Sequence, residues 1–230
     1  MIRHRPEKEL SALMNYLQEL FQQLDLQSMG SAALRVIAVF LCLTIHETSH
    51  GLAAYLLGDP TAKSMHRLSL NPLRHIDWFG LAMMFFVGFG WAKPVPVDPR
   101  YFKDPKKGMA VTALAGPVSN LLLAAVLLLI CRGMDLYAPY SDGLFTFFMF
   151  LVDTSVLSVG LGLFNLLPIP PLDGSKVLAA VLPDRAYYQL MRYERYGMLL
   201  LIVLSLMNVG GGLINQAIAA VWTGLYTLIF

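Results

Sequence analysis

Charged side chains are scarce in this chain. Only 14% of its 230 residues are Asp, Glu, Lys or Arg, whereas 57% are hydrophobic. This balance excludes an ordinary water-soluble protein and is typical of an integral membrane protein, which we expect to form a single domain. The net charge of +2 is too small to indicate a nucleic-acid partner.

Cysteine is much rarer still, with two residues in the chain. Cys42 and Cys131 both lie inside apolar runs. They therefore do not indicate a disulfide framework, and we interpret them as small buried hydrophobic residues. The sequence also has no low-complexity tract and no internal repeat. No short basic leader with a small-residue cleavage site precedes the first apolar run, so we expect no removable signal peptide.

Long apolar runs are plentiful, and they predict an all-α polytopic membrane protein with about five to six transmembrane helices. We expect membrane spans over residues 31–57, 109–131 and 143–167. A helix over 174–196 carries four basic residues and is expected at the membrane interface. The uncharged stretch 197–230 is long for one span and short for two, and the glycines at 210–212 favour a hairpin of two short or tilted spans.

Three further segments are not predicted to be ordinary membrane spans. Residues 1–30 predict an amphipathic N-terminal helix that lies on the membrane, on a partner or on the protein's own spans. The remaining residues, 31–230, would form the membrane domain. Residues 79–91 are apolar but short and rich in glycine, so we expect a re-entrant segment. Residues 91–97 carry two prolines and fit an edge strand.

A histidine-rich pentad interrupts the first apolar run. Its sequence is His46-Glu47-Thr48-Ser49-His50. Residues four apart on an α-helix share a face and lie about 6 Å apart along the axis, so both imidazoles can point at one ion. Glu47 can reach a water beside that ion and take its proton. Ionisable groups are costly at membrane depth and mark functional sites, so the pentad predicts a zinc hydrolase site rather than a chance match.

A catalytic zinc site needs a third protein ligand. The candidates are Asp173, Asp153, His66, His75, Asp77 and Glu194. Asp173 is favoured because it follows a helix end broken by proline, on the same membrane side as His50, and because Gly174 permits an unusual backbone. His66 and His75 lie in a basic loop and are interpreted as solvated or gating residues.

Two polar residues near the end of the third span have open interpretations. Asn165 lies eight residues before Asp173. Its amide can stabilise the oxyanion of a tetrahedral intermediate, or it can serve as a helix cap or an interhelical hydrogen bond. Asp153 lies in the middle of the span, either as a buried hydrogen-bonded acid or as part of a water path.

The distribution of basic residues predicts the topology. Loops 59–107 and 168–196 carry twelve Lys and Arg residues between them, whereas loop 132–142 carries one. By the positive-inside rule the first two loops are cytoplasmic. This topology places the pentad and Asp173 toward the cytoplasmic side.

Three motifs, taken together and in this order, resemble the site-2 proteases, a family of intramembrane zinc metalloproteases. They are His46-Glu47-Thr48-Ser49-His50, Gly116-Pro117-Val118-Ser119-Asn120 and Asn165-Leu166-Leu167-Pro168-Ile169-Pro170-Pro171-Leu172-Asp173-Gly174. Residues 67–73 and 89–97 are similar to a bacterial subgroup. The resemblance covers about residues 36–182, and neither a PDZ nor a CBS module fits in the chain.

The resemblance implies roles for individual residues. His46, His50 and Asp173 would bind one zinc ion per chain, and Glu47 would be the general base and acid. Asn165 would help to hold the scissile carbonyl or its oxyanion. Asn120 would line or support the site, and the strand at 91–97 would pair with an unwound substrate.

The resemblance also implies a location and substrates. The protein would be a multi-pass protein of the bacterial inner membrane that cleaves single-span membrane proteins within or near their transmembrane segments. The catalytic core would span about residues 31–182. A regulatory partner or a second copy of the chain could bind the N-terminal helix. The alternative is a catalytically inactive homologue or a metal-binding membrane module, which would need neither Glu47 nor Asn165.

Overall fold

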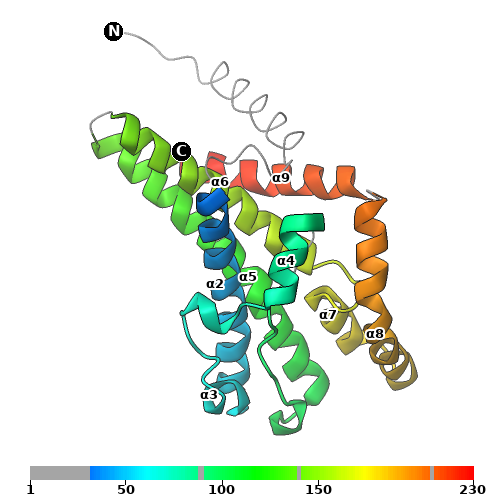
Figure 1. Ribbon diagram of the computed structural model, residues 1–230. Helices are drawn as coiled ribbons and strands as arrows, with labels where there is room; N and C mark the ends of the chain where they lie inside the picture. Colours follow the sequence, from blue (N-terminus) through cyan, green and yellow to red (C-terminus); the bar gives the residue numbers. More distant parts are fainter. Residues whose placement is uncertain (1–31, 88–90, 139–140, 208–209) are drawn as a thin grey trace.

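The protein is a bundle of helices joined by loops (Figure 1). The computed structural model describes residues 32–87, 91–138, 141–207 and 210–230. No strand occurs within these ranges, which confirms the all-α prediction. The predicted amphipathic segment 1–30 lies outside the described residues.

Four helices of the described part are long and apolar enough to cross a membrane. They are Leu34–Leu56, Pro105–Tyr137, Asp142–Asn165 and Gly211–Ile229. The first lies within α2 (Ala32–Leu56), and the others are α5, α6 and α9. The sequence predicted about five to six spans, and the difference arises in the chain after residue 173.

Helix α2 carries the pentad and ends where the sequence predicted. Gly58 follows it with φ of 105°, a backbone conformation that favours glycine. The next residue, Asp59, is fully buried and accepts a hydrogen bond from the amide of Thr61, the first residue of α3 (Thr61–Ser64). The chain therefore turns sharply at the end of α2 that lies nearer the pentad.

Helices α5 (Pro105–Tyr137) and α6 (Asp142–Asn165) begin at side-chain caps. The carboxylate of Asp104 accepts from the amide of Lys107, and the hydroxyl of Ser141 accepts from the amide of Leu144. Because Asp104 and the proline after it start the helix, α5 begins four residues before the predicted span and includes polar residues.

The connection between α2 and α5 holds short helices. They are η1 (Pro72–Arg74), α4 (Trp78–Val87) and η2 (Pro99–Tyr101). Helix α4, with ten residues, is too short to cross a membrane and lies where a re-entrant segment was expected. Residues 91–98 have no regular secondary structure, so the predicted edge strand is not formed. The amide of Lys93 bonds to the carbonyl of His75 instead of to a neighbouring strand.

After α6 the chain forms α7 (Asp173–Val181), α8 (Asp184–Leu206) and α9 (Gly211–Ile229). The interfacial helix predicted over 174–196 is in fact two helices, and the second continues to residue 206. Gly197 is helical, and a Cβ at this position would lie 2.0 Å from the carbonyl oxygen of Pro170. The turn predicted near residue 210 is present, with φ of 80° at Gly210.

Helix α5 contacts α2, α6, α7 and α9 (Figure 1). A hydrophobic core lies between α5, α6 and α9 and includes Leu128, Val159 and Trp222. The indole Nε1 of Trp222 donates to the hydroxyl of Ser155 over 2.7 Å, so the one polar atom of this large side chain is satisfied. Helix α9 crosses the bundle at the end away from α3 (Figure 1).

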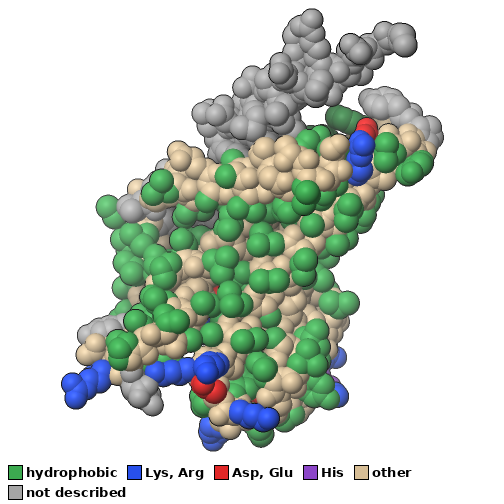
Figure 2. All heavy atoms as spheres, turned by 180° about the vertical axis from the view of Figure 1, so that it is seen from behind, with side chains coloured by type: hydrophobic (Ala, Val, Ile, Leu, Met, Phe, Trp, Pro, Cys, Tyr) green, Lys and Arg blue, Asp and Glu red, His purple; other side chains and the backbone are tan. Residues whose placement is uncertain are grey.

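Figure 2 shows Lys and Arg side chains gathered at one end of the molecule, where α3 and the start of α5 lie, and hydrophobic side chains over most of the surface between the two ends. This distribution suits a multi-pass membrane protein with one strongly basic end.

Candidate metal centre

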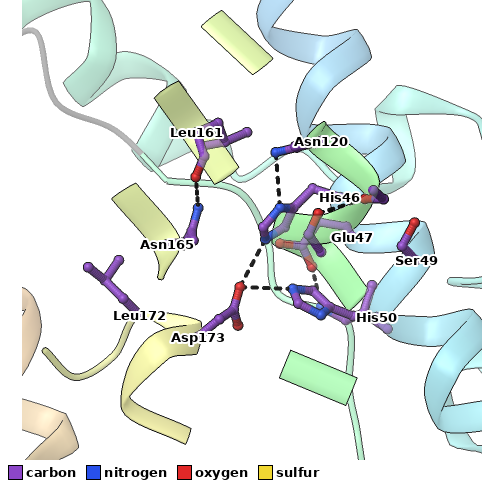
Figure 3. Close-up of polar contacts among 12 residues, drawn as sticks. His46, Glu47, Ser49, His50, Asn120, Leu161, Asn165, Leu172 and Asp173 are labelled. Atoms are coloured by element: carbon purple, nitrogen blue, oxygen red, sulfur yellow. Dashed lines mark hydrogen bonds and ion pairs between the residues drawn. The ribbon is translucent and has the colours of Figure 1, made fainter. Parts of the chain in front are cut away.

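Three buried side chains from two helices meet in the bundle (Figure 3). His46 and His50 come from successive turns of α2, and Asp173 is the first residue of α7. Oδ2 of Asp173 lies 3.1 Å from Nε2 of His46 and 3.2 Å from Nε2 of His50. The potential ligand atoms of the three residues all lie within 4.8 Å of one another. The folded chain thus brings together the three ligands that the resemblance implied.

The protonation of His50 makes this cluster suitable for a cation. Nδ1 of His50 lies 2.7 Å from the carbonyl oxygen of Thr112. Because a carbonyl can only accept, Nδ1 carries the ring proton, and Nε2 of a neutral imidazole presents a lone pair toward Asp173. Nε2 can therefore bind either a proton or a metal ion that lies between it and the carboxylate. Two imidazoles and one carboxylate form a donor set that zinc accepts.

Asp173 is prepared to act as an anionic ligand. Burial raises the pKa of its carboxyl group, but hydrogen bonds and charge from the two histidines lower it by more, so the pKa lies below its ordinary value. Its carboxylate is therefore ionised when it faces the imidazoles.

Asn120 of α5 supports His46. Its amide nitrogen lies 3.1 Å from Nδ1 of His46, and the amide is fully buried. The amide oxygen has no hydrogen-bond partner. A half-turn of the amide exchanges the two atoms and lets the oxygen accept a proton from Nδ1, as a metal-binding His46 requires. The prediction that Asn120 lines or supports the site agrees with this placement.

Gly116 provides the space for both imidazoles. A Cβ at this position would lie 2.5 Å from Nε2 of His50 and 2.7 Å from Cε1 of His46. No larger residue fits there without moving the rings. In the sequence, Gly116 is part of the second of the three motifs, but the histidines that it faces could not be identified from spacing.

Glu47 lies beside the ligands and is held by the loop after α4. Its Oε2 accepts a hydrogen bond from the backbone amide of Val95 over 2.9 Å. Sequence reasoning did not find this contact, because the contact joins residues 48 positions apart through a backbone atom.

A cavity of about 420 Å³ opens onto the three donors and Glu47. Its walls include Trp91, Phe164 and Leu201, and its polar lining includes Asn165. Nδ2 of Asn165 donates to the carbonyl oxygen of Leu161 over 2.9 Å, within its own helix. A primary amide carries two hydrogens, so one N–H remains to face the cavity.

The other candidate ligands do not join the cluster. Among the described residues, the group that could hold a metal ion consists of His46, His50 and Asp173. His75 is only 2% exposed, with Nε2 2.7 Å from the carbonyl oxygen of Ser69, so its interpretation as a solvated residue is wrong. The basic loop folds back onto α2 and buries this ring.

The remaining candidates have other surroundings. Oδ1 of Asp77 caps α4 by accepting from the amides of Phe79 and Gly80. His66 lies in a turn with φ of 55°. One carboxylate oxygen of Asp153 is buried without a hydrogen-bond partner, so the interpretation of Asp153 as a hydrogen-bonded acid does not hold for that atom. The side chain of Glu194 lies outside the described part of the chain.

Comparison with known proteins gives a consistent result. The sequence profile of peptidase family M50 matches residues 138–208, which include Asn165 and Asp173. YwhC of Bacillus subtilis is 40% identical over 180 residues, which cover 76% of this chain and 81% of YwhC. Rip2 of Mycobacterium tuberculosis strain H37Rv is 32% identical over 174 residues, which cover 73% of this chain and 64% of Rip2.

A more distant relative comes from an archaeon. MJ0392 of Methanocaldococcus jannaschii is 27% identical over 156 residues, which cover 68% of this chain and 36% of MJ0392. The names of these three relatives include the words zinc metalloprotease. No solved structure matches the chain.

Proposed function

The chain belongs to peptidase family M50, the site-2 proteases, and from this premise we propose that it is an intramembrane zinc metalloprotease. It hydrolyses peptide bonds within or near the transmembrane segments of single-span membrane proteins. The observation that carries the proposal is the convergence of His46, His50 and Asp173 beside Glu47, on a cavity between apolar helices.

The donor set fits one zinc ion per chain. His46 and His50 would bind it through Nε2, and Asp173 through its carboxylate. When bound, zinc polarises the scissile carbonyl and lowers the pKa of a water molecule toward neutrality. Thr112 and Asn120 orient the two imidazoles from behind, and such outer contacts commonly determine metal affinity.

Glu47 supplies the proton transfers. It follows His46 directly on α2 and lines the same cavity. Its carboxylate accepts a proton from the attacking water and then delivers that proton to the leaving amine. A metal-binding module without activity would not need a carboxylate at this position.

Asn165 stabilises negative charge on the substrate. The amide hydrogen that is not donated to Leu161 can donate to the carbonyl oxygen of the scissile bond as charge develops there. The position of Asn165 on the cavity wall supports this role.

The substrate must present an unwound segment, because a helix keeps its carbonyl groups in internal hydrogen bonds. Residues 91–97 border the cavity and include two prolines. A substrate strand would pair with the backbone of this segment. The N-terminal segment 1–30 is the proposed contact for a regulatory partner or a second copy of the chain.

The proposed location is the bacterial inner membrane, with the site nearer the cytoplasmic side. The basic end of the molecule supports this orientation (Figure 2). The pentad lies in the half of α2 that leads toward this end (Figure 1).

A paired measurement tests the proposal. Wild type, Glu47→Gln and the control Asp135→Asn, which changes an exposed acid far along α5, are purified in detergent. Zinc per chain and cleavage of a panel of single-span substrates are measured for each. We expect zinc in all three and cleavage in wild type and the control only. Zinc without cleavage by wild type would favour the inactive homologue, and cleavage by Glu47→Gln would overturn the assignment of the base.

A further inference from the structure

The loop after α4 touches the catalytic carboxylate through its backbone. The amide of Val95 donates to Oε2 of Glu47 over 2.9 Å, and Val95 is 8% exposed. We propose that this backbone amide is a positioning group for the general base, which fixes one oxygen of Glu47 and leaves the other to act on water. This inference rests on the proposed function.

The sequence around Val95 makes this amide the sole donor of its stretch. Pro94 and Pro96 flank Val95, and neither has a backbone N–H. Prolines also restrict the backbone, so little conformational entropy is lost when the loop holds its amide in place. The Pro94-Val95-Pro96 stretch thus presents a single N–H, and Glu47 receives it.

Residues 93–98, here called the strap, are tied to the protein on both sides of Val95. The amide of Lys93 donates to the carbonyl of His75 over 2.9 Å, and the guanidinium of Arg67 donates to the carbonyl of Lys93 over 2.7 Å. On the other side of Val95, the amide of Asp98 donates to the buried carboxylate of Asp59 over 2.7 Å. These bonds hold the strap at a fixed distance from α2.

Close packing against α2 sets that distance. A Cβ on Gly51, next to His50, would lie 3.3 Å from Cγ1 of Val95 and 3.3 Å from Cβ of Ala62. The strap therefore lies directly on the helix turn that follows the pentad.

The strap contacts Glu47 and also lines the catalytic cavity. One side holds Glu47, while Pro94, Val95 and Val97 line the catalytic cavity, where the substrate enters. A substrate segment that lies along residues 91–97 would consequently act on the same segment that positions the base. Binding of a well-fitting substrate and alignment of Glu47 are coupled through this backbone.

Replacing single backbone amides by esters tests the proposal. Incorporation of the α-hydroxy acid of valine at position 95 exchanges only the N–H for an oxygen. The matched control is the α-hydroxy acid of lysine at position 93, which removes the strap's bond to His75 and leaves the bond to Glu47. Zinc per chain, kcat and KM are measured with a cleavable single-span substrate.

We expect the ester at 95 to lower kcat by about 10- to 100-fold, as the loss of a hydrogen bond to a charged group does, with KM changed less than about twofold. Zinc per chain should stay at the wild-type value, and the ester at 93 should cost much less kcat. Equal losses from the two esters would overturn the proposal, because a purely structural strap predicts that result. Loss of zinc in the ester at 95 alone would also overturn it.

Amide exchange provides a test without activity. Metal-free protein is labelled with ¹⁵N-valine, and exchange of the Val95 amide is compared in wild type, Glu47→Gln and Glu47→Ala. We expect the amide to exchange at least about tenfold faster in Glu47→Ala and to remain protected in Glu47→Gln, whose side-chain oxygen still accepts. Equal exchange in wild type and Glu47→Ala would overturn the proposal even if the wild type cleaves substrates. If Val95 exchange changes in the two Glu47 variants as expected but the wild type cleaves no substrate, only the protease function is refuted.

Discussion

Helix α5 contributes to two buried regions that differ in chemistry. Toward its C-terminal end, Leu128 and its neighbours pack against α6 and α9 around Trp222. Toward its N-terminal end, α5 faces α2 with Thr112, Gly116 and Asn120, which surround the two histidines. We call these regions the apolar half and the metal half.

The two halves satisfy their polar atoms differently. In the apolar half, Trp222 and Ser155 pair with each other. In the metal half, the hydroxyl of Thr112 is buried without a partner, and so is the amide oxygen of Asn120 unless the amide turns that oxygen toward Nδ1 of His46. Each such atom costs about 1–3 kcal/mol of stability. The apolar half stabilises the bundle, whereas the metal half keeps buried polar groups beside the histidines at a cost in stability.

The largest effect is expected from removal of a metal ligand, which should damage the metal half and leave the apolar half folded. We predict that Asp173→Ala abolishes both stoichiometric zinc binding and cleavage, because two imidazoles alone do not complete the site. The helical content measured by circular dichroism in detergent should stay near the wild-type value. Full zinc occupancy in this variant would contradict the ligand assignment.

Loss of the Asn165 side-chain amide at the end of α6 should lower the rate of cleavage without changing zinc binding. We predict that Asn165→Ala lowers kcat by about 100- to 1,000-fold, as expected for loss of an oxyanion donor, with zinc per chain unchanged. Steady-state kinetics and metal analysis of the same preparation would check this. If kcat stays within threefold of wild type, Asn165 has only the helix-end role.

Adding one methyl group should damage the metal half selectively. We predict that Gly116→Ala lowers zinc affinity by about 10- to 100-fold, because the new Cβ would collide with both imidazoles. Gly133 on the same helix is the matched control, since a Cβ there meets nothing within 4 Å. Gly133→Ala should stabilise the helix by about 0.5–1 kcal/mol and leave zinc affinity alone. Equal zinc affinities in the two variants would show that Gly116 does not shape the site.

A substitution in the apolar half should have the smallest effect on zinc binding. We predict that Trp222→Phe lowers the free energy of unfolding by about 1–3 kcal/mol, because it leaves the Ser155 hydroxyl without its donor and a gap beside α6. Zinc per folded chain should be unchanged. Trp78, which is 72% exposed, offers a control in Trp78→Phe, with an expected change within about 0.5 kcal/mol. A loss of zinc in Trp222→Phe would mean that the two halves are not separable.

Local patterns predicted the parts of the protein that depend on neighbours in the sequence. The ends of α2 and α6 lie within two residues of the predicted spans 31–57 and 143–167, because apolar runs and the turn residues after them define those ends. The pair His46 and His50 follows from helical periodicity alone. Asp173 could be selected because a broken helix end places it on the side of His50.

Contacts between distant segments could not be predicted in this way. Helix α8 continues through Gly197, which lies against the carbonyl of Pro170, whereas the sequence suggested an end at the change from charged to apolar residues. The burial of His75 and the bond from Val95 to Glu47 also depend on how the loop folds over α2. These contacts involve backbone atoms, which leave no pattern of residue types.

The zinc absorption edge of the purified protein tests the central claim most directly, because its fine structure reports the atoms bound to the metal. We predict one zinc per chain with a first shell of nitrogen and oxygen at about 2.0–2.2 Å, as two imidazoles and a carboxylate require. Stoichiometric zinc, and with it this shell, should be lost in His46→Ala, which leaves only two protein ligands. A sulfur shell at about 2.3 Å, which would indicate Cys42 or Cys131, or an absence of zinc, would contradict the site.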